Sequence, residues 1–159
     1  MNRTVSSRET QAFRNFLLKL PHGKDIVLVV LKGHLLLEEQ VKLIVRERVR
    51  DFSRLGDARF GFYQFVCVAN ALTGKDDPAW VWPSLKKLNK LRNDIAHEMD
   101  SLSLTSDIEK FVSSVPVKFT DVNFQSNLEL ALWTLFAAVS AIVERPSASI
   151  VKLAKHGDE

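Results

Sequence analysis

One apolar segment in the last third of the sequence limits how this chain can fold. Residues 130–143 contain only two polar side chains, and a glutamate flanks each end of the segment. A helix that spans a membrane needs about 20 apolar residues, so this segment is too short for that role. A helix that is apolar almost all round belongs in the middle of a protein core. We therefore predict a central core helix over residues 123–145, which Pro146 ends.

The rest of the chain also favours long helices. Six glycines and five prolines account for 11 of 159 residues. A protein of many strands usually contains more of these residues, because they form its turns. Apolar residues recur at helical spacing along the chain. The predicted helices span residues 8–20, 24–52, 57–72, 82 to 100 or 102, 106–114 and 123–145. The expected fold is an all-α bundle of five or six helices, a single domain over residues 1–145 followed by a polar tail over residues 146–159.

Local signals suggest two helix starts and the core face of the long second helix. Ser6 or Ser7 is suited to cap the first helix. Ser106 and Glu109 have the spacing of a capping box for the fifth helix. In the second helix, the predicted core-facing residues are Val27, Leu31, Leu35, Val41, Ile44, Val45, Val49 and Phe52.

Composition excludes several classes of protein. A single cysteine, Cys67, rules out an internal disulfide framework and is typical of a reducing compartment. Residues 1–11 are polar and lack the apolar core of a signal peptide, so we expect a cytoplasmic protein without a membrane partner. The four histidines and the cysteine lack the spacing of metal ligands, so we expect neither a metal site nor a cofactor. The net charge of +3 permits an acidic partner but does not require one.

The predicted fourth helix carries an unusual set of polar residues. Asn89, Asn93 and His97 are spaced four apart and share one face, and Arg92 lies about 140° round the helix from His97. The apolar side of this helix is predicted to consist of Leu88, Leu91, Ile95, Met99 and Leu102. Asparagine is a poor helix former, so two asparagines beside a histidine need an explanation. Either Asn93 and His97 form a hydrogen-bonded pair inside the bundle, or the face is a functional site.

The segment from Arg92 to His97 reads Arg-Asn-Asp-Ile-Ala-His and follows Leu-Asn-Lys-Leu. It resembles the signature of the HEPN superfamily, the higher eukaryotes and prokaryotes nucleotide-binding fold. That signature is an Arg-x4–6-His motif, often with asparagine after the arginine, on a late helix of an all-α bundle. The resemblance covers roughly residues 24–145. In the subgroup paired with nucleotidyltransferase-type antitoxins, a tyrosine tends to stand two residues after the motif histidine, and this chain has Met99 there.

The resemblance implies a function and a set of site residues. Many members of the superfamily are metal-independent endoribonucleases that act as toxins, restrained by an antitoxin protein, or as effectors of phage defence. On that basis Arg92 and His97 are the catalytic pair and Asn93 is a polar group that orients them. Other members have lost the activity and serve as regulatory or binding modules for a protein or nucleotide partner. The sequence is compatible with both an endoribonuclease and a non-catalytic module.

The chemistry of RNA cleavage needs the same residue types. Attack by the 2′-hydroxyl needs a proton acceptor and a proton donor, and histidine titrates near neutral pH. Arginine donates a fixed fork of hydrogen bonds that suits phosphate oxygens. We expect one usable histidine per chain, because His22, His34 and His156 lie elsewhere and without supporting neighbours. His34 and Glu38 are expected to form a structural i, i+4 pair. A two-fold homodimer would bring two motif helices to one cleft.

Basic residues near the motif and at the end of the second helix are candidates for RNA binding. The run from Lys42 to Arg59 has a local charge of about +3, which suits a phosphate backbone. The alternative is an ordinary solvated face of mixed charge. The predicted RNA-binding residues are Lys86, Lys90, Asn89, Arg46 and Arg50.

Overall fold

The computed structural model describes residues 7–73, 75–97, 101–116 and 123–145. These residues form six α-helices and one 3₁₀ helix, and no strand occurs among them, so the predicted all-α class is confirmed. The α-helices are α1 (Ser7–Lys19), α2 (Ile26–Arg48), α3 (Phe62–Leu72), α4 (Val81–Ala96), α5 (Ser101–Val112) and α6 (Phe124–Glu144). The 3₁₀ helix, η1, spans Phe52–Ala58.

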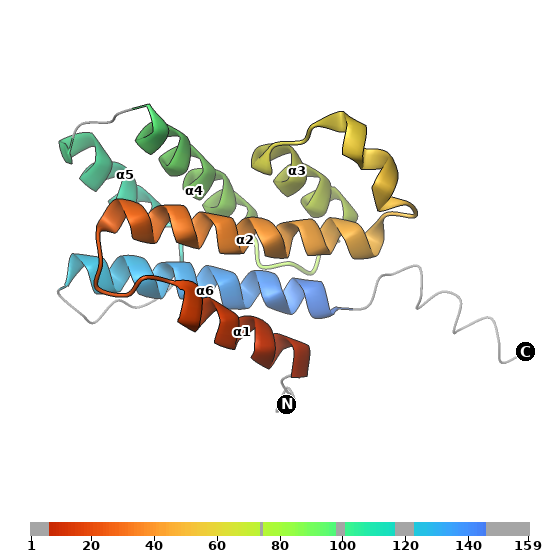
Figure 1. Cartoon of the computed structure of the whole chain (residues 1–159), viewed down its shortest axis with the longest axis horizontal. Coiled ribbons are helices and arrows are strands. Elements are labelled where there is room, and N and C mark those ends of the chain that lie inside the picture. Colours follow the sequence, from red (N-terminus) through yellow and green to blue (C-terminus); the bar gives the residue numbers. More distant parts are fainter. Residues whose placement is uncertain (1–6, 74, 98–100, 117–122, 146–159) are drawn as a thin grey trace, which may run out of the picture.

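The two longest helices form the centre of the molecule. α2 and α6 lie side by side along its long axis, and α1 packs on α6 on the side away from α3 and α4 (Figure 1). α3 and α4 pack on α2 and on each other, and α5 packs on α4 and α6. α2, α3 and α4 thus meet at a three-helix junction, and α4 is the helix that carries the predicted motif.

The contact between α2 and α6 depends on a glycine. A Cβ atom at Gly33 would lie 2.8 Å from Cδ1 of Leu132, so any larger residue would have to displace that leucine. By length and apolar content α6 is the one described helix that would pass as membrane-spanning, a property that core helices of soluble proteins share, and half of its apolar window is buried. Its contacts with α1, α2, α4 and α5 agree with the predicted core helix over residues 123–145.

Two boundaries of the long central elements differ from the prediction. α2 spans fewer residues than the predicted 24–52, because the chain becomes extended at Val49, and Phe52 belongs to η1. α3 begins at Phe62 instead of residue 57. Arg59 has a φ of 47°, in the left-handed region, and this conformation ends η1 before α3 starts.

The boundary between the fourth and fifth helices was also predicted wrongly. α4 ends at Ala96, and α5 begins at Ser101, so Ser106 lies inside α5 and caps nothing at its start. Leu102 is therefore in α5, and it is 83% exposed instead of part of the apolar side of α4. Met99 and Ser6 lie outside the described residues.

The first half of α2 presents a different face to the core from the one predicted. Leu35 is 52% exposed, and Val27 and Leu31 are only half-buried. The residues buried in this half are Val29, Val30, Gly33, His34, Leu36 and Leu37. This half of α2 is apolar on more than one side, and the close approach of Gly33 to α6 selects the face that carries the glycine. In the second half of the helix, the predicted burial of Val41, Ile44 and Val45 is confirmed.

A buried carboxylate ties the loop between α3 and α4 to the end of α6. Asp77, whose side chain is 4% exposed, accepts hydrogen bonds from the Thr73 hydroxyl and from Nε1 of Trp82, the latter at 3.2 Å. It also forms an ion pair with Arg145, which follows α6. Nearby, Arg48 donates to the carbonyl oxygens of Ile142 at 2.6 Å and of Arg145 at 3.0 Å. Arg48 therefore caps α6 and is not a free cation of the basic run.

Replacing Asp77 should destabilise the fold. In Asp77→Ala the indole N–H and the Arg145 guanidinium lose their shared acceptor, so we expect the free energy of unfolding to fall by about 2 kcal/mol. Asp76→Ala is the matched control, because Asp76 is exposed and such surface changes stay within about 0.5 kcal/mol. Urea denaturation measures both. Equal stability of the two variants would contradict the assigned role of Asp77.

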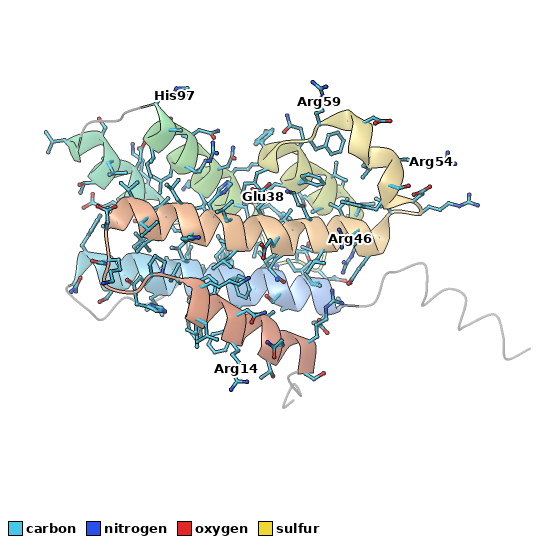
Figure 2. All side chains as sticks on the ribbon, viewed as in Figure 1. Arg14, Glu38, Arg46, Arg54, Arg59 and His97 are labelled. Atoms are coloured by element: carbon cyan, nitrogen blue, oxygen red, sulfur yellow. The ribbon has the colours of Figure 1, made fainter. Side chains whose placement is uncertain are left out.

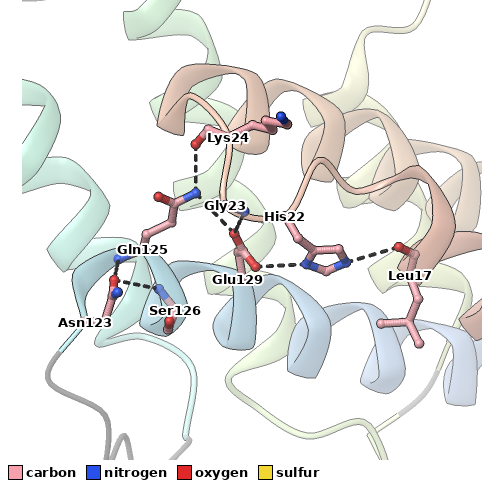
Figure 3. Close-up of polar contacts among 8 residues, drawn as sticks. All are labelled: Leu17, His22, Gly23, Lys24, Asn123, Gln125, Ser126 and Glu129. Carbon is pink, nitrogen blue, oxygen red and sulfur yellow. Dashed lines mark hydrogen bonds and ion pairs between the residues drawn. The ribbon is translucent and has the colours of Figure 1, made fainter.

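The turn between α1 and α2 is fastened to α6 by Glu129. Its two carboxylate oxygens accept hydrogen bonds from Nδ1 of His22 at 2.9 Å and from the backbone N–H of Gly23 at 3.0 Å (Figure 3). Gln125 adds a hydrogen bond of 2.7 Å to the carbonyl oxygen of Lys24. The hydrogen bond that His22 donates to Glu129 raises the pKa of His22 above its ordinary value. Burial raises the pKa of Glu129, but its hydrogen bonds to Gly23, His22 and Gln125 outweigh burial and lower the pKa.

These shifts predict a pH window for the His22–Glu129 contact. The His22 contribution is fully present below the ordinary pKa of 6.5 and is lost as the pH rises through the raised pKa. The Glu129 contribution is present above the ordinary value of 4.5 and is lost as the pH falls through the lowered pKa. We therefore expect Glu129→Gln to cost most stability between about pH 5 and 6 and less at pH 8.

The effect should stay below about 1 kcal/mol because His22 is half exposed. Denaturant unfolding at several pH values measures it, with Glu39→Gln on the exposed side of α2 as the control. A cost of Glu129→Gln that grows from pH 6 to pH 8 would contradict this assignment.

Candidate functional site

The motif residues lie at the polar C-terminal end of α4. The first part of this helix is anchored in the core by Trp82, Leu85, Leu88 and Leu91. From Arg92 onward its side chains are exposed or half-buried. Figure 2 shows His97 at the end of α4 that points away from α2. The helix is therefore fixed at one end and presents polar groups to solvent at the other.

Two of the three predicted catalytic residues touch each other. Arg92 donates a hydrogen bond from Nη1 to Oδ1 of Asn93 at 3.2 Å, and both side chains are exposed. His97 is the C-cap of α4, where its backbone N–H bonds the carbonyl oxygen of Asp94 at 3.1 Å, and its side chain is exposed. The interpretation of Asn93 and His97 as a hydrogen-bonded pair inside the bundle is therefore wrong.

Arg92 and His97 do not share a face of α4. They are five positions apart, which corresponds in a regular helix to about 7.5 Å along the axis and about 140° round it. Only Asn89 and Asn93 of the predicted polar stripe lie within the helix, because His97 ends it. One chain therefore presents its arginine and its histidine on different sides of the helix end.

A second histidine lies near the motif, which the sequence analysis did not expect. His34 of α2 is 4% exposed, and its ring contacts the ring of Phe62 on α3 edge-on, with 4.5 Å between centroids. Its Nδ1 lies 3.8 Å from the Glu38 carboxylate, in the i, i+4 pairing that was expected. The expectation that His34 lacks supporting neighbours is wrong.

The surroundings of His34 keep its ring neutral. Burial lowers the pKa of His34 most strongly, and the positive charge of Arg92 lowers it further. The carboxylate of Glu38 acts in the opposite direction but does not outweigh burial. A histidine with a lowered pKa is uncharged at neutral pH.

A row of polar residues runs along α2 toward the basic residues at the C-terminal end of this helix. We call it the α2 stripe, and it consists of His34, Glu38, Lys42 and Arg46. Glu38 and Lys42 form an ion pair at 2.7 Å. The cations of this stripe also lie over aromatic rings, Lys42 at 5.4 Å from the centroid of Phe65 and Arg46 at 5.1 Å from that of Phe52. The tertiary structure thus brings cations of α2 into contact with aromatic rings of η1 and α3.

The two lysines predicted to bind RNA have different surroundings on α4. Nζ of Lys86 lies 5.6 Å from the ring centroid of Tyr63, which is 48% exposed. Lys90 is paired with Asp94 on its own helix and with Asp107 of α5 at 3.2 Å. The charge of Lys90 is therefore largely neutralised, whereas Lys86 lies beside an exposed aromatic ring.

The remaining candidates lie at the C-terminal end of α2. Figure 2 shows Arg46 and Arg54 at this end of the helix, away from His97. A surface hollow of about 590 Å³ is lined there by Val49, Arg50, Asp51 and Arg54. Arg54 is paired with Asp51 at 3.0 Å. The predicted RNA-binding residues therefore form two groups, one on α4 and one near η1.

Metal ligands do not gather in the described ranges, where no three His, Cys, Asp or Glu side chains could hold one ion together. Comparisons with protein-family models, with curated proteins and with solved structures find no match for this chain.

The accessibility of the two histidines near α4 should differ strongly. Diethylpyrocarbonate acylates exposed neutral imidazoles, so we expect His97 to react at least about tenfold faster than His34, which is sealed among three helices. Peptide mass spectrometry on timed samples measures each rate. In urea the two rates should converge, which controls for intrinsic reactivity. Equal rates in the folded protein would show that the junction around His34 is open.

Proposed function

We propose that this chain is a metal-independent endoribonuclease of the HEPN type that cleaves RNA with Arg92 and His97. The observation that carries the proposal is the exposed and unneutralised state of the motif. Arg92 and His97 are both exposed, and neither has an ion pair with a carboxylate in the described part of the chain. Lys90, two residues before Arg92, has two such carboxylates. A guanidinium without a carboxylate partner can donate its fork of hydrogen bonds to phosphate oxygens.

Each motif residue has a distinct part in the proposed reaction. Arg92 binds the non-bridging oxygens of the phosphate and offsets the charge that develops on them. Asn93 accepts the hydrogen bond from Arg92 and restricts the orientation of the guanidinium. A histidine base takes the proton of the 2′-hydroxyl as its oxygen attacks phosphorus, and a histidine acid gives a proton to the departing 5′-oxygen. The products are a 2′,3′-cyclic phosphate and a 5′-hydroxyl.

Because the side chains of Arg92 and His97 leave different sides of the helix end, a homodimer is favoured as the active form. One helix end directs the two side chains about 140° apart. A two-fold pairing of α4 with its copy would place an arginine from each chain and a histidine from each chain round one cleft. As a toxin, such a protein would also require a protein antitoxin that covers the exposed motif, and it would act in the cytoplasm.

The route of the RNA strand is part of the same proposal. Lys86 beside Tyr63 offers a positive charge and an exposed ring on which a base can stack. Arg46 and Arg50 extend the positive surface toward η1, and Asn89 is a half-buried residue of α4. Lys90 contributes less, because Asp94 and Asp107 neutralise it.

The central test is cleavage of RNA without metal. Purified protein with excess EDTA should cut single-stranded RNA and leave cyclic phosphate ends, and His97→Asn or Arg92→Gln should lower the rate by roughly 10²–10⁴-fold. The matched controls are His22→Asn and Arg14→Gln, since both sites lie outside the proposed one and Arg14 is on α1 (Figure 2). Activity that vanishes in EDTA and returns with a divalent ion would refute this mechanism.

Assembly is measured on the same samples. Sedimentation should give the mass of a dimer at micromolar concentration, and chains mixed with His97→Asn should form dimers of reduced activity. A monomer that cleaves at full rate would refute the composite site. If no RNA is cleaved under any of these conditions, the non-catalytic module with a protein or nucleotide partner becomes the better explanation of the motif.

A further inference from the structure

The outer face of α2 carries leucines that the described part of the chain leaves in solvent. Leu28 is 42% exposed and Leu35 is 52% exposed. Leu31 lies between them and is half-buried, and the three side chains fall within about 60° of one another round the helix. Leucines scattered singly over a surface are ordinary, whereas neighbouring leucines on one face of one helix form a patch that a partner can cover.

Charged residues complete a regular pattern on the same face. Leu28, Lys32, Leu35 and Glu39 are spaced four, three and four positions apart, and all four are exposed. This is the spacing of the contact positions in paired helices. We call these four residues the α2 seam. Neither Lys32 nor Glu39 pairs with a charged group in the described part of the chain, so both charges are available to a partner.

The α2 seam is complementary to itself when a second copy runs antiparallel to it. In a two-fold pairing centred between positions 31 and 32, Leu28 of each chain faces Leu35 of the partner subunit, because the two positions lie equally far from the centre. The two copies of Leu31 flank the axis. The same register places the exposed Lys24 opposite Glu39 of the partner subunit, once at each end. Leucine then meets leucine in the middle, and opposite charges meet at both ends.

Lys32 is the charged residue of the α2 seam that lies near the axis. It is about 100° round the helix from Leu31 and therefore at the edge of the contact. A lysine at such an edge covers apolar surface with its stem while its ammonium group stays in solvent. Since the two copies of Lys32 lie close to each other across the axis, removal of this charge should not weaken the pairing.

The site of the proposed reaction lies to one side of the α2 seam. His34, whose ring contacts Phe62 of α3, is about 100° round the helix from Leu35. α3 and α4 both pack on α2, and Figure 1 shows them on the same side of it. The axis of an antiparallel pair is perpendicular to the plane of the two helices, so elements beside the seam lie on the same side of the dimer in both chains. A composite site requires the two copies of α4 to be arranged in this way.

We propose that the α2 seam is the surface through which this chain pairs with a second copy of itself, antiparallel and with Leu28 against Leu35 of the partner subunit. The inference rests on the proposed function in that a site divided between two chains needs a second copy. It adds the surface and the register that bring this copy into place.

Sedimentation of the full chain at micromolar concentration measures the dimer without RNA. Leu35→Glu places a carboxylate in the seam and should raise the dissociation constant of the dimer by at least about 100-fold. Leu18→Glu is the matched control, because Leu18 is 78% exposed on α1 and should leave the dimer unchanged. Circular dichroism checks that both variants keep their helices. A monomeric wild-type chain, or a Leu35→Glu chain that pairs as the wild type does, overturns the inference.

Exchange of the end charges tests the register. Lys24→Glu and Glu39→Lys each place like charges opposite one another, and each should weaken the dimer about three- to tenfold. The double variant Lys24→Glu/Glu39→Lys restores opposite charges and should return the dissociation constant to within about twofold of the wild type. Additive losses in the double variant, or a dimer that Lys32→Gln weakens, would overturn this register.

Cysteine pairs test the same register covalently. Oxidation should link the chains of Leu28→Cys/Leu35→Cys, whereas Leu35→Cys alone should stay unlinked. The two copies of position 35 are about 10.5 Å apart along the helix axis, and a disulfide spans at most about 7 Å between Cα atoms. The wild-type chain, whose one cysteine is Cys67, is the control. Linking of Leu35→Cys alone, or no linking of the double variant, contradicts the proposed pairing.

The outcomes separate this inference from the proposed function. A chain that cleaves RNA but fails these dimer tests overturns the inference alone. A chain that pairs in the stated register but cleaves no RNA overturns the proposed function alone.

Discussion

The rest of the structure depends on the close contact of α2 with α6 at Gly33. Only a residue without a side chain lets the two helices approach while Leu132 keeps its position. This contact lies on the face of α2 that meets α6. The face with Leu35 is left in solvent, and His34 and the rest of the α2 stripe are turned toward α3 and α4. A helix cannot present every apolar side to the core at once, and the tightest contact decides which side it presents.

The rotation of α2 determines what surrounds the motif helix. α4 is anchored by the buried residues of its first part, and beyond Leu91 it emerges into solvent with Arg92, Asn93 and His97 exposed. The motif is thus carried by a helix whose first part is fixed in the core and whose end is open to solvent.

The charges of the molecule divide into those that serve the fold and those that are free for a partner. Asp77, Arg48 and Glu129 are bound to backbone groups or to partners on other segments, and they hold loops to α6. Lys90 joins α4 to α5 through Asp107. Arg92, Lys86 and Arg46 form no ion pair with another described residue, and the last two lie over aromatic rings. The basic residues among these have the same formal charge in the sequence, but their availability to RNA differs.

The sequence alone determined the fold class, because apolar residues recur at helical spacing and glycine and proline are scarce, a pattern typical of helices. It also determined that Arg92, Asn93 and His97 are neighbours along a helix, because that relation is local. Tertiary structure decided that Leu35 faces solvent, that Lys90 is neutralised and that His34 is buried against Phe62 of α3. Each of these depends on a contact between segments distant in the chain, such as Gly33 with Leu132 or Lys90 with Asp107. Periodicity states which faces of a helix are apolar, but only packing against the other helices decides which of those faces is buried.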